Sequence, residues 1–251
     1  MISKTSPHYQ VEGSGHLLIH VAGLDGTGQL FFKQAPRLGL AYRVITFRSR
    51  EHGRFTYEDL TDDLLAIIRD QGEQRATIVG ESFGGTVALN FAVRYPRMVE
   101  RLVVVNSFPR FRNRLTIKLG AKVASGVPFR MLWGVRRAAS ALGLLVDGVG
   151  RDDRRLFWRA IRTVSSDGYA RRLQLIEALD LEARLSEIQA PTLFIAGDRD
   201  LLIPSVKEAY AMAARMPNAR VKVIKGAGHV CLLGSRVRLD RILAEWDETF
   251  L

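Results

Sequence analysis

Short apolar runs alternate along the chain with longer stretches in which apolar residues recur every three or four positions. These short runs have the length of strands, and they cover residues 17–22, 42–47, 76–79, 101–106, 191–196 and 221–224. The longer stretches have the spacing of helices that bury one face, and they cover residues 57–70, 85–92, 168–181, 205–214 and the end of the chain. This alternation predicts an α/β fold with a mostly parallel central sheet and helices on both of its faces.

Two of the expected helices have recognisable ends. A helix is expected to run through Phe31 and Phe32 and to stop near Pro36. Thr56 is expected to cap the helix over residues 57–70. The inner face of that helix would hold Leu60, Leu64, Leu65 and Ile68.

The alternation of strands and helices breaks at Ser107. Residues 108–166 show only helix-like apolar spacing, which is interrupted by Gly126, Pro128, Gly143 and Gly148. The strand–helix pattern then resumes and continues to the end of the chain. We therefore expect a core formed by residues 1–107 and 167–251, with residues 108–166 inserted between two strands as a helical lid.

The segment around Ser82 joins a predicted strand to a predicted helix. Residues 76–79 run into Gly80-Glu81-Ser82-Phe83-Gly84, and the helix follows from Gly85. Glycines two positions before and after the serine permit a tight turn that pushes its hydroxyl outward above the sheet edge. A glycine-rich turn without a chemical role is the alternative, but the strand before and the helix after favour a nucleophile.

A serine nucleophile needs a base that accepts its proton and a carboxylate that orients the base. His229 follows the last strand in a glycine-rich loop, at the strand end where open α/β sheets place their sites. Asp200 follows the preceding strand and is expected to reach over the sheet edge. Asp198 is the competing carboxylate, which we expect to cap its loop through an Asx turn or to pair with Arg199. The predicted triad is Ser82, Asp200 and His229.

Two backbone N–H groups are needed to hold the oxyanion that forms during acyl transfer. One is expected from Phe83, the residue after the nucleophile, and the other from Leu24, in the loop after the first predicted strand. The same loop, residues 23–28, is rich in glycine and could instead cradle a phosphate. It lacks the Lys-Ser/Thr of a P-loop and the full G-x-G-x-x-G spacing, which disfavours that alternative.

The remaining candidate ligands suggest no further chemistry. His20 lies inside an apolar run and is expected to be a core histidine with satisfied hydrogen bonds. Cys231 is expected to fill space in the core. No Cys, His and carboxylate cluster has the spacing of metal ligands, so we expect no metal and no cofactor.

Charge adds a feature that the apolar pattern does not contain. The chain has 251 residues and a net charge of +11, and residues 108–172 carry 15 Lys/Arg against 4 Asp/Glu, so this segment supplies the excess. One cysteine excludes an internal disulfide and is typical of a reducing compartment. There is no apolar run long enough to cross a bilayer and no signal-peptide pattern at the start. These features predict a cytoplasmic protein.

Taken together, these motifs resemble the α/β-hydrolase superfamily, and most of all its small bacterial esterase- and thioesterase-like members. The resemblance covers most of the chain. It is carried by the loop at 20–28, Gly80-Glu81-Ser82-Phe83-Gly84-Gly85, the insertion after Asn106, Gly197-Asp198-Arg199-Asp200 with Pro204, and Gly228-His229. The chain departs from the pattern at Val21-Ala22-Gly23, where many relatives have His-Gly, and it thereby lacks a side chain that often braces the oxyanion loop.

The function predicted from these residues is a serine hydrolase that cleaves a carboxylic ester or thioester with a hydrophobic acyl group. An acyltransferase with the same triad is one alternative, and a non-catalytic relative that binds a ligand or protein is another. The basic face of the lid could bind an anionic membrane surface and so make the protein peripheral to the membrane. It could also attract an acidic substrate, or it could simply be solvated. Nucleic acid is disfavoured because no recognised binding module accompanies the charge. The sequence does not indicate an oligomeric state.

Overall fold

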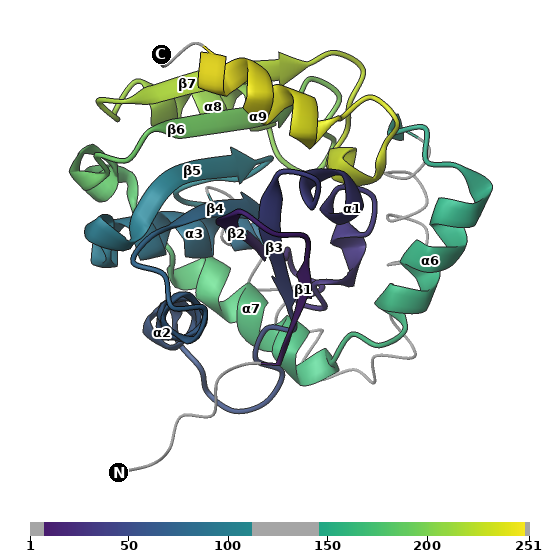
Figure 1. Ribbon diagram of the computed structural model, residues 1–251, viewed down its shortest axis with the longest axis horizontal. Helices are drawn as coiled ribbons and strands as arrows, with labels where there is room; N and C mark the ends of the chain where they lie inside the picture. Colours follow the sequence, from purple (N-terminus) through teal and green to yellow (C-terminus); the bar gives the residue numbers. More distant parts are fainter. Residues whose placement is uncertain (1–7, 112–145, 249–251) are drawn as a thin grey trace.

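Seven strands form one sheet in the part of the chain that the computed structural model describes, residues 8–111 and 146–248 (Figure 1). The strands are β1 (Tyr9–Glu12), β2 (His16–Val21), β3 (Tyr42–Phe47), β4 (Ala76–Glu81), β5 (Val99–Val105), β6 (Thr192–Gly197) and β7 (Ala219–Ile224). Their order is β1-β3-β2-β4-β5-β6-β7, and only β1 pairs antiparallel with its neighbour. The predicted mostly parallel sheet is confirmed, whereas β1 was not predicted.

The register of the parallel strands brings their carboxyl ends to one edge of the sheet. Val21 on β2 pairs with Gly80 on β4, and Glu81 at the end of β4 pairs with Val105 at the end of β5. Gly197 at the end of β6 pairs with the last residue of β7. The loops that follow β2, β4, β5, β6 and β7 therefore open on the same side of the molecule.

Helices cover both faces of the sheet, as predicted (Figure 1). One apolar cluster packs a face of the sheet against α2 (Tyr57–Asp70), α3 (Phe83–Arg94), α7 (Ser166–Ala178) and α8 (Ser205–Ala213). A second cluster packs the opposite face against α1 (Ala35–Leu38) and α9 (Leu239–Glu248). Helix α6 (Arg151–Ile161) lies beyond the sheet and forms a smaller apolar cluster with Leu233 (Figure 1).

The predicted cap of α2 is present. The Thr56 side chain accepts a hydrogen bond from the Asp59 N–H at 3.2 Å, and the Asp59 carboxylate accepts from the Thr56 N–H at 2.9 Å. This reciprocal arrangement is a capping box. The four leucine and isoleucine side chains expected on the inner face are buried.

The helix expected through Phe31 and Phe32 is wrong in its extent. A short 3-10 helix covers Gln29–Phe31, and α1 begins separately at Ala35. Pro36 lies in the first turn of α1 rather than after a helix end, because proline is tolerated where the N–H has no intrahelical acceptor. The other 3-10 helices of the described chain are Pro96–Met98, Glu182–Glu187 and Cys231–Leu233.

The predicted lid is described only in part. Residues 108–111 and 146–166 are described and contain α6, whereas the basic residues Lys118, Lys122, Arg130, Arg136 and Arg137 lie outside the described residues. The boundaries of the lid therefore stay a prediction. No helix in the described ranges is both long enough and apolar enough to cross a bilayer.

Candidate active site

Ser82 lies in the sharp turn between β4 and α3. Its backbone angles, φ 54° and ψ −119°, fall outside the regions that a serine normally adopts. The turn is fixed by hydrogen bonds from the Ser82 N–H to the Val105 carbonyl at 2.9 Å and from the Ser107 hydroxyl to the Ser82 carbonyl at 2.7 Å. Backbone strain of this kind costs about 1–3 kcal/mol and persists only where surrounding contacts fix it.

The glycines around Ser82 are required by close packing. A Cβ on Gly80 would lie 2.4 Å from the Gly84 carbonyl oxygen, and a Cβ on Gly84 would lie 2.0 Å from the Val21 carbonyl oxygen. Both distances are far below a van der Waals contact. The G-x-S-x-G pattern therefore brings the start of α3 against β2 and β4, so that the serine lies at the carboxyl edge of the sheet.

Ser82, His229 and Asp200 form a continuous hydrogen-bonded chain. The His229 Nε2 lies 2.9 Å from the Ser82 Oγ, and its Nδ1 lies 2.8 Å from the Asp200 Oδ2. The side chains are contributed by the loops after β4, β7 and β6, which the parallel register places side by side. The His229 side chain is 13% exposed to solvent, and the Asp200 side chain is only 1% exposed. The arrangement can pass a proton from the hydroxyl to the imidazole while the carboxylate fixes the ring.

The surroundings of Asp200 favour its ionised form. Burial raises the pKa of the Asp200 carboxyl, but the hydrogen bonds from His229, Ser205 and Leu202 outweigh burial and leave the pKa below its ordinary value. The competing carboxylate, Asp198, is directed elsewhere. It accepts a hydrogen bond from the Gly226 N–H at 2.6 Å, and it forms neither the expected Asx turn nor the expected pair with Arg199.

Two buried residues support the triad loops and were missed by sequence reasoning. The Asn106 amide donates to the carbonyls of Gly228 and His229 at 2.9 and 3.0 Å and accepts from the Gly197 N–H at 2.9 Å. The Asp147 carboxylate accepts from the Gly228 N–H at 2.6 Å and from the Val230 N–H at 3.1 Å. Burial raises the pKa of Asp147, although these two N–H donors act against the rise. Both residues therefore fix the backbone around His229.

Both expected oxyanion donors belong to segments next to Ser82, one following it in the chain and the other in the loop after β2. Phe83 is the first residue of α3, where a backbone N–H has no acceptor within the helix. Leu24 lines the same cavity as Ser82, and a Cβ on the adjacent Gly23 would lie 3.5 Å from the Ser82 Cβ. In the same loop the Thr27 N–H donates to the Asp25 carboxylate at 2.9 Å, and this negative charge argues against a phosphate cradle.

A cavity of about 370 Å³ opens beside Ser82 and His229. Ser82, His229 and Glu81 lie in its lining with Arg199. Most of the other lining side chains are apolar or aromatic: Leu24, Leu30, Val146, Phe157, Ile161, Tyr169, Leu201, Leu202, Val230 and Leu233. The volume and this lining are typical of a site for a small molecule with a sizeable apolar part.

Glu81 precedes the serine and lines the cavity. Burial raises the pKa of its carboxyl to about 8, and repulsion from Asp25 and Asp147 adds to the rise. The side chain is therefore largely neutral at pH 7. A neutral acid at this position places no negative charge beside the site where an oxyanion would form.

His20 is buried as predicted, but the expectation that its hydrogen bonds are satisfied is wrong. Neither ring nitrogen has a partner among the described residues, and the ring stacks on Phe31 with a centroid distance of 4.0 Å. Burial lowers the pKa of His20 to about 3. Over the described ranges, no group of three or more His, Cys, Asp or Glu side chains is arranged to hold a metal ion.

A family model and several known proteins match this chain. The model described as "Alpha/beta hydrolase family" matches residues 12–239. A protein of Serratia proteamaculans (strain 568) named "Putative carbamate hydrolase RutD" is 26% identical over 245 residues, which cover 91% of this chain and 90% of that protein.

Solved structures match the fold over nearly the whole chain. A hydrolase from Pseudomonas aeruginosa PA01 has a TM-score of 0.82 at 22% identity, with 96% of this chain and 92% of that chain covered. An esterase (EaEST) from Exiguobacterium antarcticum has a TM-score of 0.81 at 20% identity, with 96% and 95% covered. At these identities the likeness establishes the fold alone.

Proposed function

The chain belongs to the alpha/beta hydrolase family, and on that premise we propose that it is a serine hydrolase that cleaves a carboxylic ester or thioester through an acyl-enzyme. One observation carries the proposal. The Asp200 carboxylate, the His229 ring and the Ser82 hydroxyl are linked by contacts of 2.8 and 2.9 Å, and Ser82 and His229 line a largely apolar cavity.

In the first half of the reaction, the Ser82 oxygen attacks the acyl carbon of the substrate while the His229 Nε2 accepts the hydroxyl proton. The Asp200 carboxylate holds the ring through Nδ1 and stabilises the imidazolium that forms. The Leu24 and Phe83 N–H groups hold the oxyanion of the tetrahedral intermediate. Collapse of this intermediate breaks the bond to the alcohol or thiol, which leaves with the proton from His229, and the acyl group stays on Ser82.

In the second half, water replaces the leaving group. His229 accepts a proton from the water as it attacks the acyl carbon of the acyl-serine ester. The second tetrahedral intermediate uses the same two N–H donors. Its collapse returns the proton to the Ser82 oxygen and releases the carboxylic acid, so that the enzyme is regenerated.

The lining of the cavity supports an apolar acyl group. Leucine, valine, isoleucine and aromatic side chains form most of its walls, and burial of each methylene group is worth about 0.8 kcal/mol. Carbamate hydrolysis is the second candidate, because the Serratia relative carries this activity in its name. A small carbamate would leave most of the apolar wall unfilled, which favours the larger acyl substrate.

Two alternatives to a hydrolase differ in what the serine does. An acyltransferase would use the same residues and replace water with another acceptor, and a binding protein would need no reactive serine.

The positive excess between residues 108 and 172 supports contact of the lid, residues 108–166, with an anionic membrane surface. This contact is peripheral and would weaken as salt is added.

A fluorophosphonate probe tests the nucleophile. We expect the probe to label the intact protein at Ser82 and not to label Ser82→Ala. We also expect Ser82→Ala to lower kcat for p-nitrophenyl esters by about 10⁴-fold or more. Ser186→Ala is the matched control, since Ser186 is exposed and does not line the cavity. An intact protein that neither reacts with the probe nor turns over an ester would support the binding alternative.

A series of p-nitrophenyl esters of increasing chain length then identifies the substrate class. The apolar lining predicts that kcat/KM rises with acyl length until the cavity is filled, whereas a carbamate hydrolase would prefer a small aryl carbamate. Product analysis with an added alcohol separates hydrolysis from acyl transfer, because transfer gives a new ester rather than the free acid. The series with and without anionic vesicles tests the membrane contact.

A further inference from the structure

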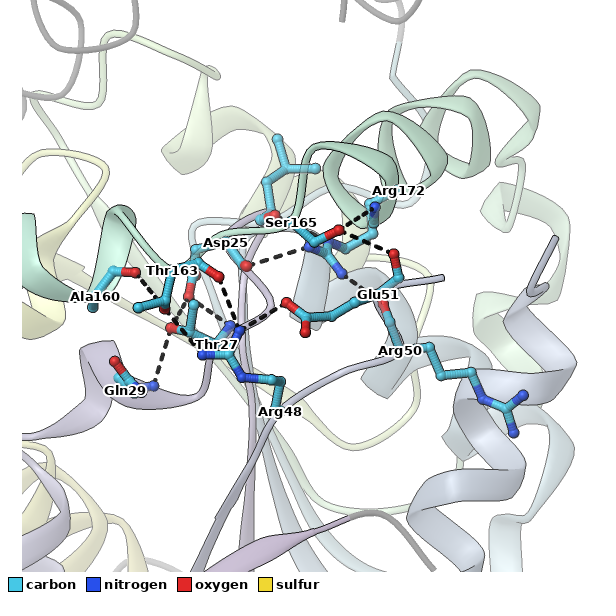
Figure 2. A network of polar contacts seen from close by, with 12 residues as sticks. Asp25, Thr27, Gln29, Arg48, Arg50, Glu51, Ala160, Thr163, Ser165 and Arg172 are labelled. Carbon is cyan, nitrogen blue, oxygen red and sulfur yellow. Dashed lines mark hydrogen bonds and ion pairs between the residues drawn. The ribbon is translucent and has the colours of Figure 1, made fainter. Parts of the chain in front are cut away.

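Arg172 is a fully buried arginine on α7 that binds backbone instead of an acidic side chain. Its Nε donates to the Leu24 carbonyl at 2.9 Å, its Nη1 to the Arg50 carbonyl at 3.0 Å and its Nη2 to the Asp25 carbonyl at 3.2 Å. Figure 2 shows the side chain reaching from α7 towards the segments that carry Asp25 and Arg50. Two of its three acceptors therefore belong to the loop that carries a predicted oxyanion donor.

The loop is a tight turn whose own hydrogen bonds leave these carbonyls free. The Gly26 N–H donates to the Gly23 carbonyl at 3.0 Å, which closes the turn. Because a peptide unit is planar, fixing the Gly23 carbonyl also fixes the direction of the Leu24 N–H. The next two carbonyls, those of Leu24 and Asp25, are the ones that Arg172 holds.

The packing of Gly26 shows that the turn is built around the guanidinium. Gly26 has a φ of 65°, and a Cβ at this position would lie 2.6 Å from the Arg172 Cζ. The Gly26 carbonyl in turn accepts from the Ser49 N–H at 2.8 Å, in the segment after β3. Arg172 thus ties the loop after β2, the segment after β3 and α7 into one unit.

A second arginine reinforces the same junction. The Arg48 guanidinium binds the Glu51 carboxylate at 2.7 Å, and it also donates to the carbonyl and hydroxyl of Thr163, just after α6 (Figure 2). Burial lowers the pKa of Arg172 to about 10 while attraction from Asp25 and Glu51 opposes the shift, so the guanidinium stays charged at neutral pH.

We propose that Arg172 is a positioning residue that holds the Leu24 N–H in place for the oxyanion. It takes over the bracing that the sequence lacks at Val21-Ala22-Gly23. The inference rests on the proposed function. Arg172 does not line the cavity, so it acts through the loop and not on the substrate.

Two variants of Arg172 test this role. Arg172→Met removes every donor and keeps much of the aliphatic stem, and we expect kcat to fall by about 10- to 100-fold because a displacement of about 1 Å in an active site is worth that much. KM should stay within about threefold, since the apolar cavity is unchanged. Arg172→Lys keeps the charge without the planar fork that reaches three carbonyls, and we expect an intermediate loss.

Arg171→Met is the matched control. Arg171 is the neighbouring residue on α7, and it also binds a backbone carbonyl, that of Phe55 at 2.7 Å, but it has no bond to the loop that carries Leu24. We expect this variant to keep kcat within about twofold. Affinity for an alkylboronic acid, which forms a tetrahedral adduct on a reactive serine, should fall in step with kcat in the Arg172 variants and stay constant in Arg171→Met.

Amide hydrogen exchange of residues 23–26 gives a readout that does not depend on turnover. Exchange should quicken in the Arg172 variants and stay unchanged in Arg171→Met. Folded Arg172 variants with the kcat, boronate affinity and exchange of the wild type would overturn the proposal. Equal losses in the Arg172 and Arg171 variants, matched by equal losses of stability, would also overturn it. Should Arg172→Met fail to fold, the Arg172→Lys data decide.

The same measurements separate this inference from the proposed function. If the wild-type protein does not react with a fluorophosphonate and does not turn over esters, the proposed function fails. The exchange data would then still show whether Arg172 holds the loop.

Discussion

Asn106 joins the loop that carries Asp200 to the loop that carries His229. Its amide binds the Gly197 N–H on one side and the Gly228 and His229 carbonyls on the other, and it also donates to the Cys231 Sγ at 3.3 Å. The residue has a φ of 45°, in the left-handed region that asparagine tolerates better than most other residues. A single side chain thus links the two loops that carry Asp200 and His229.

We predict that Asn106→Ala destabilises the protein by about 3 kcal/mol, because it leaves buried backbone groups unpaired and places alanine in a left-handed conformation. In urea titrations the unfolding midpoint should fall accordingly. We also expect kcat for a p-nitrophenyl ester to fall more than 10-fold, since the two loops lose their link.

Asn90→Ala is the control for this substitution. The Asn90 amide donates to the Thr86 carbonyl within α3, so its loss leaves the triad loops intact. We expect a change within about 0.5 kcal/mol and an unchanged kcat. Equal effects of the two substitutions would contradict the role given to Asn106.

At the scale of residues, the sequence predicts functional side chains that belong to a sequence motif, and it misses side chains whose role depends only on tertiary contacts. Ser82, Asp200 and His229 each lie just after a predicted strand, so the parallel sheet alone brings them to one edge. Asn106 carries the same signal, since it ends the strand predicted at 101–106. Arg172 falls on the apolar stripe of a predicted helix with Leu175 and Ile176, and a charged residue at such a position was the signal for a buried role.

At the scale of elements, the capping box makes α2 a defined unit. Thr56→Ala removes the acceptor for the Asp59 N–H and should cost about 1 kcal/mol. Thr56→Ser keeps the hydroxyl and should cost less than half as much. Urea unfolding measures both, and kcat should be unchanged because α2 contributes no residue to the cavity lining. Equal losses in the two variants would show that the methyl group, not the cap, stabilises the helix end.

Elements with a clear period were predicted, and those that depend on a neighbour were not. Four of the six predicted strands, β2, β4, β5 and β6, carry continuous apolar runs because both of their faces are largely buried. β3 and β7 are more exposed and include Arg43 and Lys222, but apolar residues still recur along them. Strand β1 is exposed over most of its length and takes its conformation from pairing with β3, so it gives no apolar signal. The division of the expected helix near Phe31 into two short helices also has no period of its own, since each is shorter than two turns.

At the scale of the whole molecule, the positive excess is not all on the surface. Arg172 belongs to the basic segment 108–172 yet is buried against backbone carbonyls. A charge count along the sequence cannot separate such an internal cation from a solvated one. Electrostatic attraction of an anionic partner therefore depends on fewer charges than the sequence suggests.

Buried ionisable groups also set how the stability of the whole molecule depends on pH. Burial lowers the pKa of His20 to about 3, whereas an unfolded histidine titrates near 6.5. Below about pH 6.5 the unfolded chain binds a proton that the folded chain does not, so stability falls as the pH is lowered. Glu81 has the opposite effect. Its pKa of about 8 lets the folded chain keep a proton that the unfolded chain loses above about pH 4.5, so its contribution to stability falls as the pH rises.

The pH dependence of the wild type alone therefore does not isolate His20, but a comparison with His20→Leu does. When the pH is lowered from 8 to 5, His20 should destabilise the wild type by about 2 kcal/mol, because pH 5 lies ~1.5 units below the pKa of an unfolded histidine. We predict that His20→Leu, which keeps a similar volume against Phe31, removes this part of the acid loss in urea titrations at the two pH values. Identical pH dependence in wild type and His20→Leu would mean that the ring accepts a proton in the folded state.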